Sequence, residues 1–314
     1  MILKPQRVMT GMFAAALAAA IPAAPASTPN AAGGQAQMVI TVQPAHPGGS
    51  VPGSLDPSEL TVLQRNTRVP VLSVKRLSGS LAGMQLFVFL DDSARSTSLG
   101  VQLSELKAFL RSLPDTMQVG IGYMRSGGAK VVQPFTYDRQ KAADALRLPE
   151  AMPGENGSPY FALSDLVKHW PSKEPTGRRV ALLFTDGVDR YNQDQTIMDD
   201  PYADVAAADA LKNGVTVYSV YLRDAGRYDR GAWVTNMAQS RLLKLCEETG
   251  GHAYEDYLFD PVEIWPYLND FRARLDNQYT VTFQALNQRG VEPVKLRTEL
   301  PGLKIECPSR VYVP

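Results

Sequence analysis

Apolar runs alternate with amphipathic segments through the middle of the chain. Gln85–Leu90 and Val180–Phe184 are almost wholly apolar, which is typical of parallel strands that helices cover on both faces. Leucines at helical spacing between 103 and 113 predict a helix that stops at Pro114. Further strands are expected at 119–123, 130–135, 215–222 and 252–255, and further helices at 139–146, 162–170, 203–211, 241–248 and 261–275. This alternation predicts an α/β fold with a doubly wound, mostly parallel six-stranded sheet and helices on both faces.

Short β-prone runs without a helical period lie on both sides of this block. They occupy 38–42, 60–63 and 69–74 before it, and 279–285, 293–300, 303–306 and 310–313 after it. Neither stretch alone could cover its apolar face, and the two ends of a domain often lie close together. We therefore expect residues 38–80 and 278–314 to form one small β-sandwich, and residues 83–276 to form the α/β domain.

The first residues have the pattern of a secretory signal peptide. Lys4 and Arg7 precede an Ala-rich apolar stretch at 8–21, and Ala24-Pro-Ala26 offers a cleavage site. The apolar stretch is short for a membrane span. We expect a signal peptide at 1–26, a disordered leader at 27–37, a secreted, periplasmic or cell-envelope location, and no stable membrane insertion after cleavage.

Charge and cysteine content exclude two classes of protein. The chain has 32 basic and 32 acidic residues without a long Lys/Arg run, so no nucleic-acid partner is predicted. Two cysteines, Cys246 and Cys307, are too few for a disulfide-dense scaffold. They could pair in an oxidising compartment, but Cys246 shares a helix face with Leu242 and Leu243, which favours a buried free thiol.

Both long apolar strands end in carboxylates. Asp91, Asp92 and Ser93 follow the first strand, and Asp186 follows the second. Ligands of doubly wound sheets bind beyond the carboxyl ends of the strands, so Asp91 and Asp186 are expected to share one site. Two neighbouring carboxylates repel each other unless a cation or a proton is shared, which makes Mg²⁺ the first candidate.

With these motifs, residues 83–276 resemble the von Willebrand factor type A domain. In that family the first strand ends in Asp-x-Ser-x-Ser, a later loop supplies a Thr, and the fourth strand ends in Asp-Gly. The resemblance implies a metal-ion-dependent adhesion site in which Asp91, Ser93 and Asp186 are ligands. The whole chain also resembles the acidobacterial proteins with a type A-related domain.

The sequence departs from the family pattern at two positions. Arg95 stands in place of the second Ser, and 156–162 contains no Thr. Ser96 or Ser158 is an alternative source of a hydroxyl ligand. The site is therefore degenerate: either Mg²⁺ (or Mn²⁺ or Ca²⁺) binds there, or the Arg95 guanidinium replaces the cation.

The resemblance implies an exported, non-enzymatic module that binds a protein through this face in adhesion or assembly. In intact sites an acidic side chain of the partner completes the metal coordination. Candidate binding residues are Asp92, expected to be solvated, and Arg95, Arg227, Arg230 and Trp233.

Two other functions stay open. One is a metal-independent structural or scaffold component of the cell envelope that docks through its β-sandwich. The other is a metal-dependent hydrolase at the same carboxylates, but the chain has no Gly-x-Ser-x-Gly, phosphate-loop or His-Glu-x-x-His motif.

Overall fold

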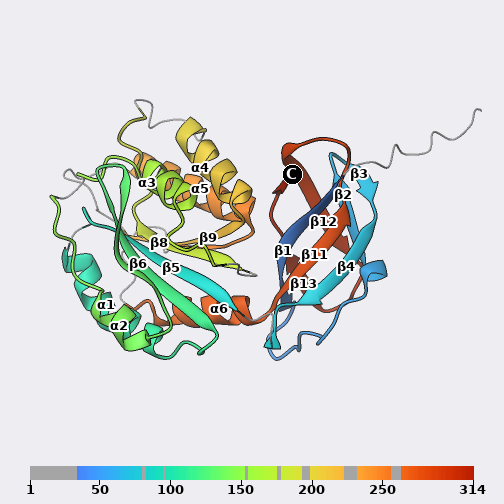
Figure 1. Ribbon diagram of the computed structural model, residues 1–314, viewed down its shortest axis with the longest axis horizontal. Coiled ribbons are helices and arrows are strands. Elements are labelled where there is room, and N and C mark those ends of the chain that lie inside the picture. The colour runs from blue at the N-terminus through green and yellow to red at the C-terminus, as the bar shows by residue number, and fades with distance from the viewer. Residues whose placement is uncertain are drawn as a thin grey trace, which may run out of the picture.

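The computed structural model describes residues 34–79, 83–94, 96–152, 155–174, 178–192, 199–222, 232–255 and 263–314. Figure 1 shows an α/β lobe beside a lobe built mainly of strands. The expected signal peptide at 1–26 lies outside the described residues, as do Arg95, Arg227 and Arg230.

The α/β lobe is built on a sheet with the strand order β10-β9-β8-β5-β6-β7. Only β7 runs antiparallel to its neighbour, so the expected fold class is confirmed. β6 and β7 are joined by a two-residue turn in which Ser126 and Gly127 both have positive φ, the geometry of a tight hairpin. The strands are β5 (Met84–Asp91), β6 (Met117–Arg125), β7 (Gly128–Thr136), β8 (Arg179–Thr185), β9 (Val215–Tyr221) and β10 (Ala253–Tyr254).

Helices cover both faces of this sheet (Figure 1). One face packs against α1 (Ser96–Arg111), α2 (Arg139–Asp144) and α6 (Trp265–Asp276). The other packs against α3 (Pro159–Lys168), α4 (Pro201–Lys212) and α5 (Ala232–Thr249). Every residue of β5 is buried, which accounts for its uninterrupted apolar sequence.

Two helices begin elsewhere than their apolar pattern predicts. α5 starts at Ala232 rather than near 241; its first half mixes apolar and polar residues without a clear helical period, so the apolar pattern did not reveal it. α6 starts at Trp265 rather than 261, where Glu105 Oε2 accepts hydrogen bonds from the backbone N–H groups of Ile264 and Trp265. A carboxylate from a distant helix thus satisfies the first N–H groups of α6, which no local pattern reveals.

The second lobe is a sandwich of two antiparallel sheets, with strand orders β13-β1-β11-β4 and β14-β12-β2-β3. Each sheet contains strands from both ends of the chain, and their apolar side chains share one core. The strands are β1 (Gln35–Pro44), β2 (Leu60–Gln64), β3 (Thr67–Val69), β4 (Val71–Arg76), β11 (Gln278–Gln284), β12 (Gly290–Thr298), β13 (Leu303–Glu306) and β14 (Arg310–Val313), with a short 3₁₀ helix at Pro57–Glu59. β1 begins at Gln35, within the expected disordered leader, because Gln35 already pairs with Gln284 of β11.

Polar contacts join the two lobes. Arg310 of β14 forms an ion pair with Glu248 of α5, and Arg274 of α6 bonds to Glu306 of β13. Both cysteines are free, and Cys246 is buried with its thiol 3.4 Å from Ser219 Oγ. Within the described ranges, no helix combines the length and the apolar character needed to cross a membrane.

Candidate functional site at the carboxyl ends of β5 and β8

Strand pairing brings the acidic residues at the ends of β5 and β8 together. Leu90 is in register with Phe184, so Asp91 at the end of β5 lies beside Thr185, and Asp186 follows directly. Asp91 and Asp186 are 0% and 1% exposed. The structure therefore brings Asp91, Ser93 and Asp186 to one buried site, where their proposed role as metal ligands remains a prediction.

Four hydrogen bonds saturate the Asp91 carboxylate. Oδ1 accepts from the backbone N–H and the hydroxyl of Ser93, at 2.9 and 2.7 Å. Oδ2 accepts from Thr185 Oγ1 at 3.3 Å and from Asn156 Nδ2 at 3.5 Å. Asn156 also donates its backbone N–H to Ser93 Oγ at 3.2 Å, so this one residue of the loop before α3 bonds to both Asp91 and Ser93.

The pKa of Asp91 is raised to about 6, mainly by burial and secondly by the negative charge of Asp186. The hydrogen bonds from Ser93 and the positive charge of Arg190 oppose the increase. The ionised form of Asp91 is therefore disfavoured in this site, as expected for two carboxylates placed close together away from water.

A guanidinium occupies the position next to Asp186. Arg190 Nη2 lies 3.0 Å from Asp186 Oδ2, and Asp186 Oδ1 accepts the backbone N–H of Val188 at 3.0 Å. The backbone N–H of Arg190 donates to the carbonyl of Gly157 at 2.7 Å, which anchors the loop. The turn requires Gly187, whose φ is +67° and whose added Cβ would lie 2.6 Å from Leu242.

The donor set only partly fits the metal ion that the family resemblance implies. Carboxylate and hydroxyl oxygens suit Mg²⁺. However, Asp91 already accepts four hydrogen bonds, and Arg190 occupies Oδ2 of Asp186. Among the described residues, no group of three His, Cys, Asp or Glu side chains could hold a metal. In this arrangement the residues do not fit a six-coordinate ion, because Arg190 would have to leave first.

Asp92, which was expected to be solvated, is fully buried. The chain turns after β5, and the backbone N–H of Asp92 donates to Met124 O, which directs the residue over the end of β6. Its Oδ1 lies 2.6 Å from Arg147 Nη1, and its Oδ2 lies 3.5 Å from Arg125 Nη1. Burial alone would raise the pKa of Asp92, but hydrogen bonds from Arg147 and from the backbone N–H of Glu150, together with the charges of both arginines, hold it below its ordinary value.

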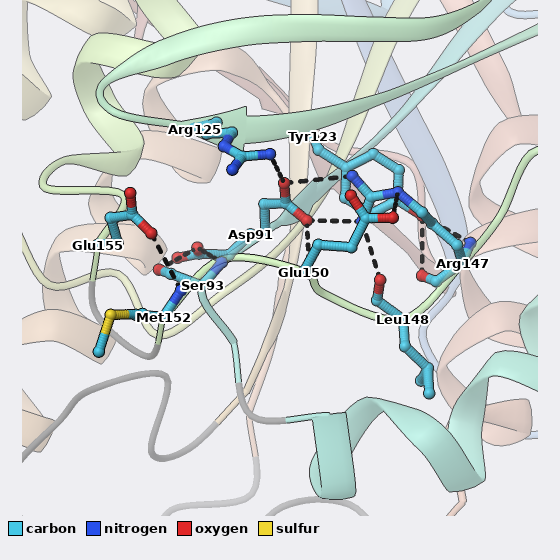
Figure 2. A network of polar contacts seen from close by, with 10 residues as sticks. Asp91, Ser93, Tyr123, Arg125, Arg147, Leu148, Glu150, Met152 and Glu155 are labelled. Carbon is cyan, nitrogen blue, oxygen red and sulfur yellow. Dashed lines mark hydrogen bonds and ion pairs between the residues drawn. The ribbon is translucent and has the colours of Figure 1, made fainter.

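Arg147 is itself held from several directions (Figure 2). Its guanidinium lies 3.9 Å from the centroid of the Tyr123 ring, and its Nε lies 3.1 Å from Glu150 Oε1. The same view shows Met152 and Glu155 beside Ser93, where Glu155 accepts the backbone N–H of Met152.

Ser158 and Trp233 are the other predicted residues whose side chains the structure describes. Ser158 is buried, but its hydroxyl caps α3 by accepting the N–H of Phe161 at 3.3 Å and bonds to Asp189. Ser96 is the first residue of α1, and its side chain lies outside the description. Trp233 lies in the first turn of α5 and is 58% exposed.

Sequence reasoning missed four residues of this region: Asn156, Thr185, Arg147 and Arg190. Thr185 could have been found, since it precedes Asp186 directly in the motif. Arg190 also had a signal, because an arginine four residues after a strand-end aspartate can fold back onto it. Asn156 and Arg147 come from loops whose course the apolar pattern does not predict.

No family model matches the chain, and no curated protein matches it. Among solved structures it is similar to an aerotolerance-related membrane protein of Bacteroides fragilis with multiple mutations to serine, at 15% identity over 62% of this chain and 99% of that one, with a TM-score of 0.41. It is also similar to the conserved hypothetical protein BatB of Bacteroides thetaiotaomicron, at 16% identity over 62% and 98%, TM-score 0.38. A von Willebrand factor type A protein of Catenulispora acidiphila shares 10% identity over 89% and 73%, TM-score 0.43. These likenesses concern the course of the chain and not its site.

Proposed function

We propose that this protein is a non-enzymatic binding module of the von Willebrand factor type A kind, which meets an acidic segment of a partner protein in adhesion or assembly. The surface involved surrounds the ends of β5, β6 and β8 and is called the arginine face here. It comprises Arg125, Arg147 and Arg190. The observation that carries the proposal is that buried carboxylates hold all three guanidinium groups at this one end of the sheet.

Each of the three arginines is ion-paired with a buried carboxylate and is still partly exposed to solvent. The side chains of Arg125, Arg147 and Arg190 are 38%, 26% and 21% exposed, whereas Asp92 and Asp186 beneath them are at most 1% exposed. Because the arginine side chains are already held in place, they lose less conformational entropy when a partner's carboxylate binds. A planar guanidinium can bind that carboxylate through two hydrogen bonds.

Exposed apolar side chains lie beside the arginines and could supply contact area. Leu148 and Met152 follow Arg147 in the chain and are 42% and 60% exposed. Phe161 and Tyr191, also exposed, form an edge-to-face pair with ring centroids 5.4 Å apart. Aromatic residues and arginines together are typical of the side chains that dominate binding energy in protein interfaces.

The proposed mode of binding needs no metal ion. Arg190 supplies positive charge beside the two carboxylates, a role that the sequence suggested for Arg95, which lies outside the described residues. A partner's carboxylate would then bind guanidinium groups directly, instead of completing the coordination of Mg²⁺. Mg²⁺ binding remains the competing prediction, and it requires Arg190 to move away from Asp186.

Fluorescence anisotropy with a labelled peptide of glutamate and glycine tests the arginine face in EDTA. We expect Arg125→Glu to weaken binding about tenfold or more, because it replaces one charge-assisted contact by repulsion. Arg68→Glu is the matched control, since Arg68 is exposed on β3 of the sandwich lobe. Equal binding by wild type and Arg125→Glu, or binding that requires Mg²⁺, would contradict the proposal.

If the protein is instead a metal-independent scaffold, EDTA should also have no effect, but Arg125→Glu should leave peptide binding unchanged. It is favoured by the polar contacts that fix the sandwich lobe to α5 and α6. The hydrolase alternative is separated by a screen with phosphoester and peptide substrates, in which we expect no turnover. We further propose a secreted or envelope location, and fractionation of cells that express the full chain measures it.

A further inference from the structure

Strand β1 is paired along most of one side but only along its last four residues on the other. β11 pairs with Gln35–Thr41, whereas β13 pairs only with Thr41–Pro44. The hydrogen bonds Val42 N to Asn277 O and Ala285 N to Gly34 O show that even-numbered residues face β11. The backbone groups of Gln35, Gln37 and Val39 therefore point away from β11, toward the side that β13 does not reach.

After β13 the chain no longer pairs with this edge, and β14 pairs with β12 instead. Pro308 follows β13, and the backbone N–H of Ser309 donates to Glu247 O at the end of α5. Within the described residues, no backbone or side-chain group is bonded to the outward N–H or C=O of Gln37 or Val39. The edge segment Gln35–Val39 instead lines a groove of about 400 Å³.

The walls of this groove come from both lobes. One wall is the end of α4 and the start of β9, from Leu211 to Thr216, and the other is β14 with its flanking prolines. This is the end of the α/β sheet opposite the arginine face, since Val215 begins β9 whereas Asp91 and Thr185 end their strands.

The other edges of the three sheets carry the features that usually prevent strand addition. Such edges are normally protected by charged side chains, prolines or shortness. Among the described strands, β10 has two residues, and every other strand at the end of a sheet contains a charged residue: Arg68 in β3, Lys75 in β4, Lys130 in β7, Lys304 in β13 and Arg310 in β14. Gln35–Val39 has neither charge nor proline.

The shape and charge of the groove select one kind of occupant. A second copy of the chain would have to bring its own recessed edge into the groove, where the walls of both copies would collide. A single extended peptide has no such walls, and five residues of strand span about 16 Å. The charged side chains that line the groove are Lys212 and Arg310, of which Arg310 is also paired with Glu248, and no Asp or Glu lines it. We propose that this groove binds an extended acidic peptide segment of a partner protein, which adds to β1 as a strand.

Hydrogen exchange measured amide by amide tests the pairing directly. The probe is a labelled peptide in which valine and glutamate alternate, added to the full chain. We expect the amides of Gln37 and Val39 to exchange rapidly in the free protein and to become protected with the peptide. Met38 and Ile40 are built-in controls, because their amides already face β11.

Variants separate backbone pairing from side-chain contact. Gln37→Pro removes one outward N–H at an edge position, where proline is tolerated, and we expect about five- to tenfold weaker peptide binding. Gln37→Ala keeps the N–H and should bind as the wild type does. Lys212→Glu should bind a peptide of alternating valine and lysine more tightly than the valine–glutamate peptide, the reverse of the wild type. This measurement keeps the proposal testable if Gln37→Pro fails to fold.

Several outcomes would overturn this inference. One is equal affinity for a peptide N-methylated at every residue, which has no N–H group to donate to the edge. A second is protection of Gln37 and Val39 in the free monomer, which would mean that the chain's own preceding segment fills the groove. A third is protection that appears only with a dimer in sedimentation. Arg125→Glu should leave this binding unchanged, so failure here is distinct from failure at the arginine face.

Discussion

Replacing Asp91 by asparagine should make the protein more stable at neutral pH. Burial and the neighbouring Asp186 raise the pKa of Asp91 from its ordinary 3.8 to about 6. A carboxyl group with a raised pKa binds more protons in the folded state, so its ionisation lowers stability as pH increases between these two values. Asparagine keeps an oxygen for the Ser93 donors and removes the charge.

The magnitude follows from the pKa change. At about 1.4 kcal/mol for each tenfold change in proton affinity, ionisation of Asp91 destabilises the wild type by roughly 3 kcal/mol at about pH 7.5 and by roughly 1 kcal/mol at about pH 4.5. The new amide N–H₂ meets Asn156 Nδ2 or Thr185 Oγ1, which offsets about 1 kcal/mol at every pH. The net gain for Asp91→Asn is about 2 kcal/mol at the higher pH and near zero at the lower.

Urea unfolding at both pH values, in EDTA, measures this difference. The informative quantity is the change in unfolding free energy between variant and wild type, which should increase by about 2 kcal/mol from the lower pH to the higher. Asp186→Asn is the contrasting variant, because it leaves Arg190 without its carboxylate and should destabilise. An Asp91→Asn variant that is less stable than the wild type at both pH values would refute the electrostatic account.

Further predictions concern the neighbouring contacts. Asp92→Asn should lose about 1.5–3 kcal/mol of unfolding free energy near neutral pH. The loss should shrink in acid, because the lowered pKa of Asp92 gives stability that is present above its ordinary pKa and disappears as pH falls. A loss that does not change with pH in urea melts would argue against the Arg147 pair as the cause. Gly187→Ala should lose about 2–4 kcal/mol, because φ is +67° and the new Cβ would lie 2.6 Å from Leu242. Gly214→Ala is its matched control in the same thermal melts, since φ is +65° there but no atom lies within 4 Å, and a loss of about 1 kcal/mol is expected; equal losses for both would show that contact with Leu242 is unimportant.

The fold class could be predicted because its signals are local. Continuous apolar runs such as Gln85–Leu90 arise when a strand is covered on both faces, and parallel neighbours place their ends at the same edge. This is why Asp91 and Asp186 were expected together, as the structure has them. The β-sandwich followed from the same reasoning, since neither terminal stretch could cover its apolar face alone.

The details of the site depend on contacts that the apolar pattern does not encode. Asp92 was expected to be solvated because side chains alternate along a strand, but the chain turns after Asp91 and Arg147 arrives from a distant loop. Arg95, the guanidinium that the sequence suggested, lies outside the described residues, and the structure places Arg190 beside Asp186 through a turn that depends on Gly187. Loop conformation thus decides which cation meets the carboxylates.

Thermal melts of wild type and Arg190→Ala, each in Mg²⁺ and in EDTA, test most directly whether Arg190 takes the place of a metal ion beside Asp186. We predict the same midpoint for wild type in both conditions, since the guanidinium occupies the carboxylate oxygen. Arg190→Ala should melt lower in EDTA and recover roughly 5 °C in Mg²⁺ at about 100 times the dissociation constant. A wild type that gains a similar increase with Mg²⁺ would contradict this account.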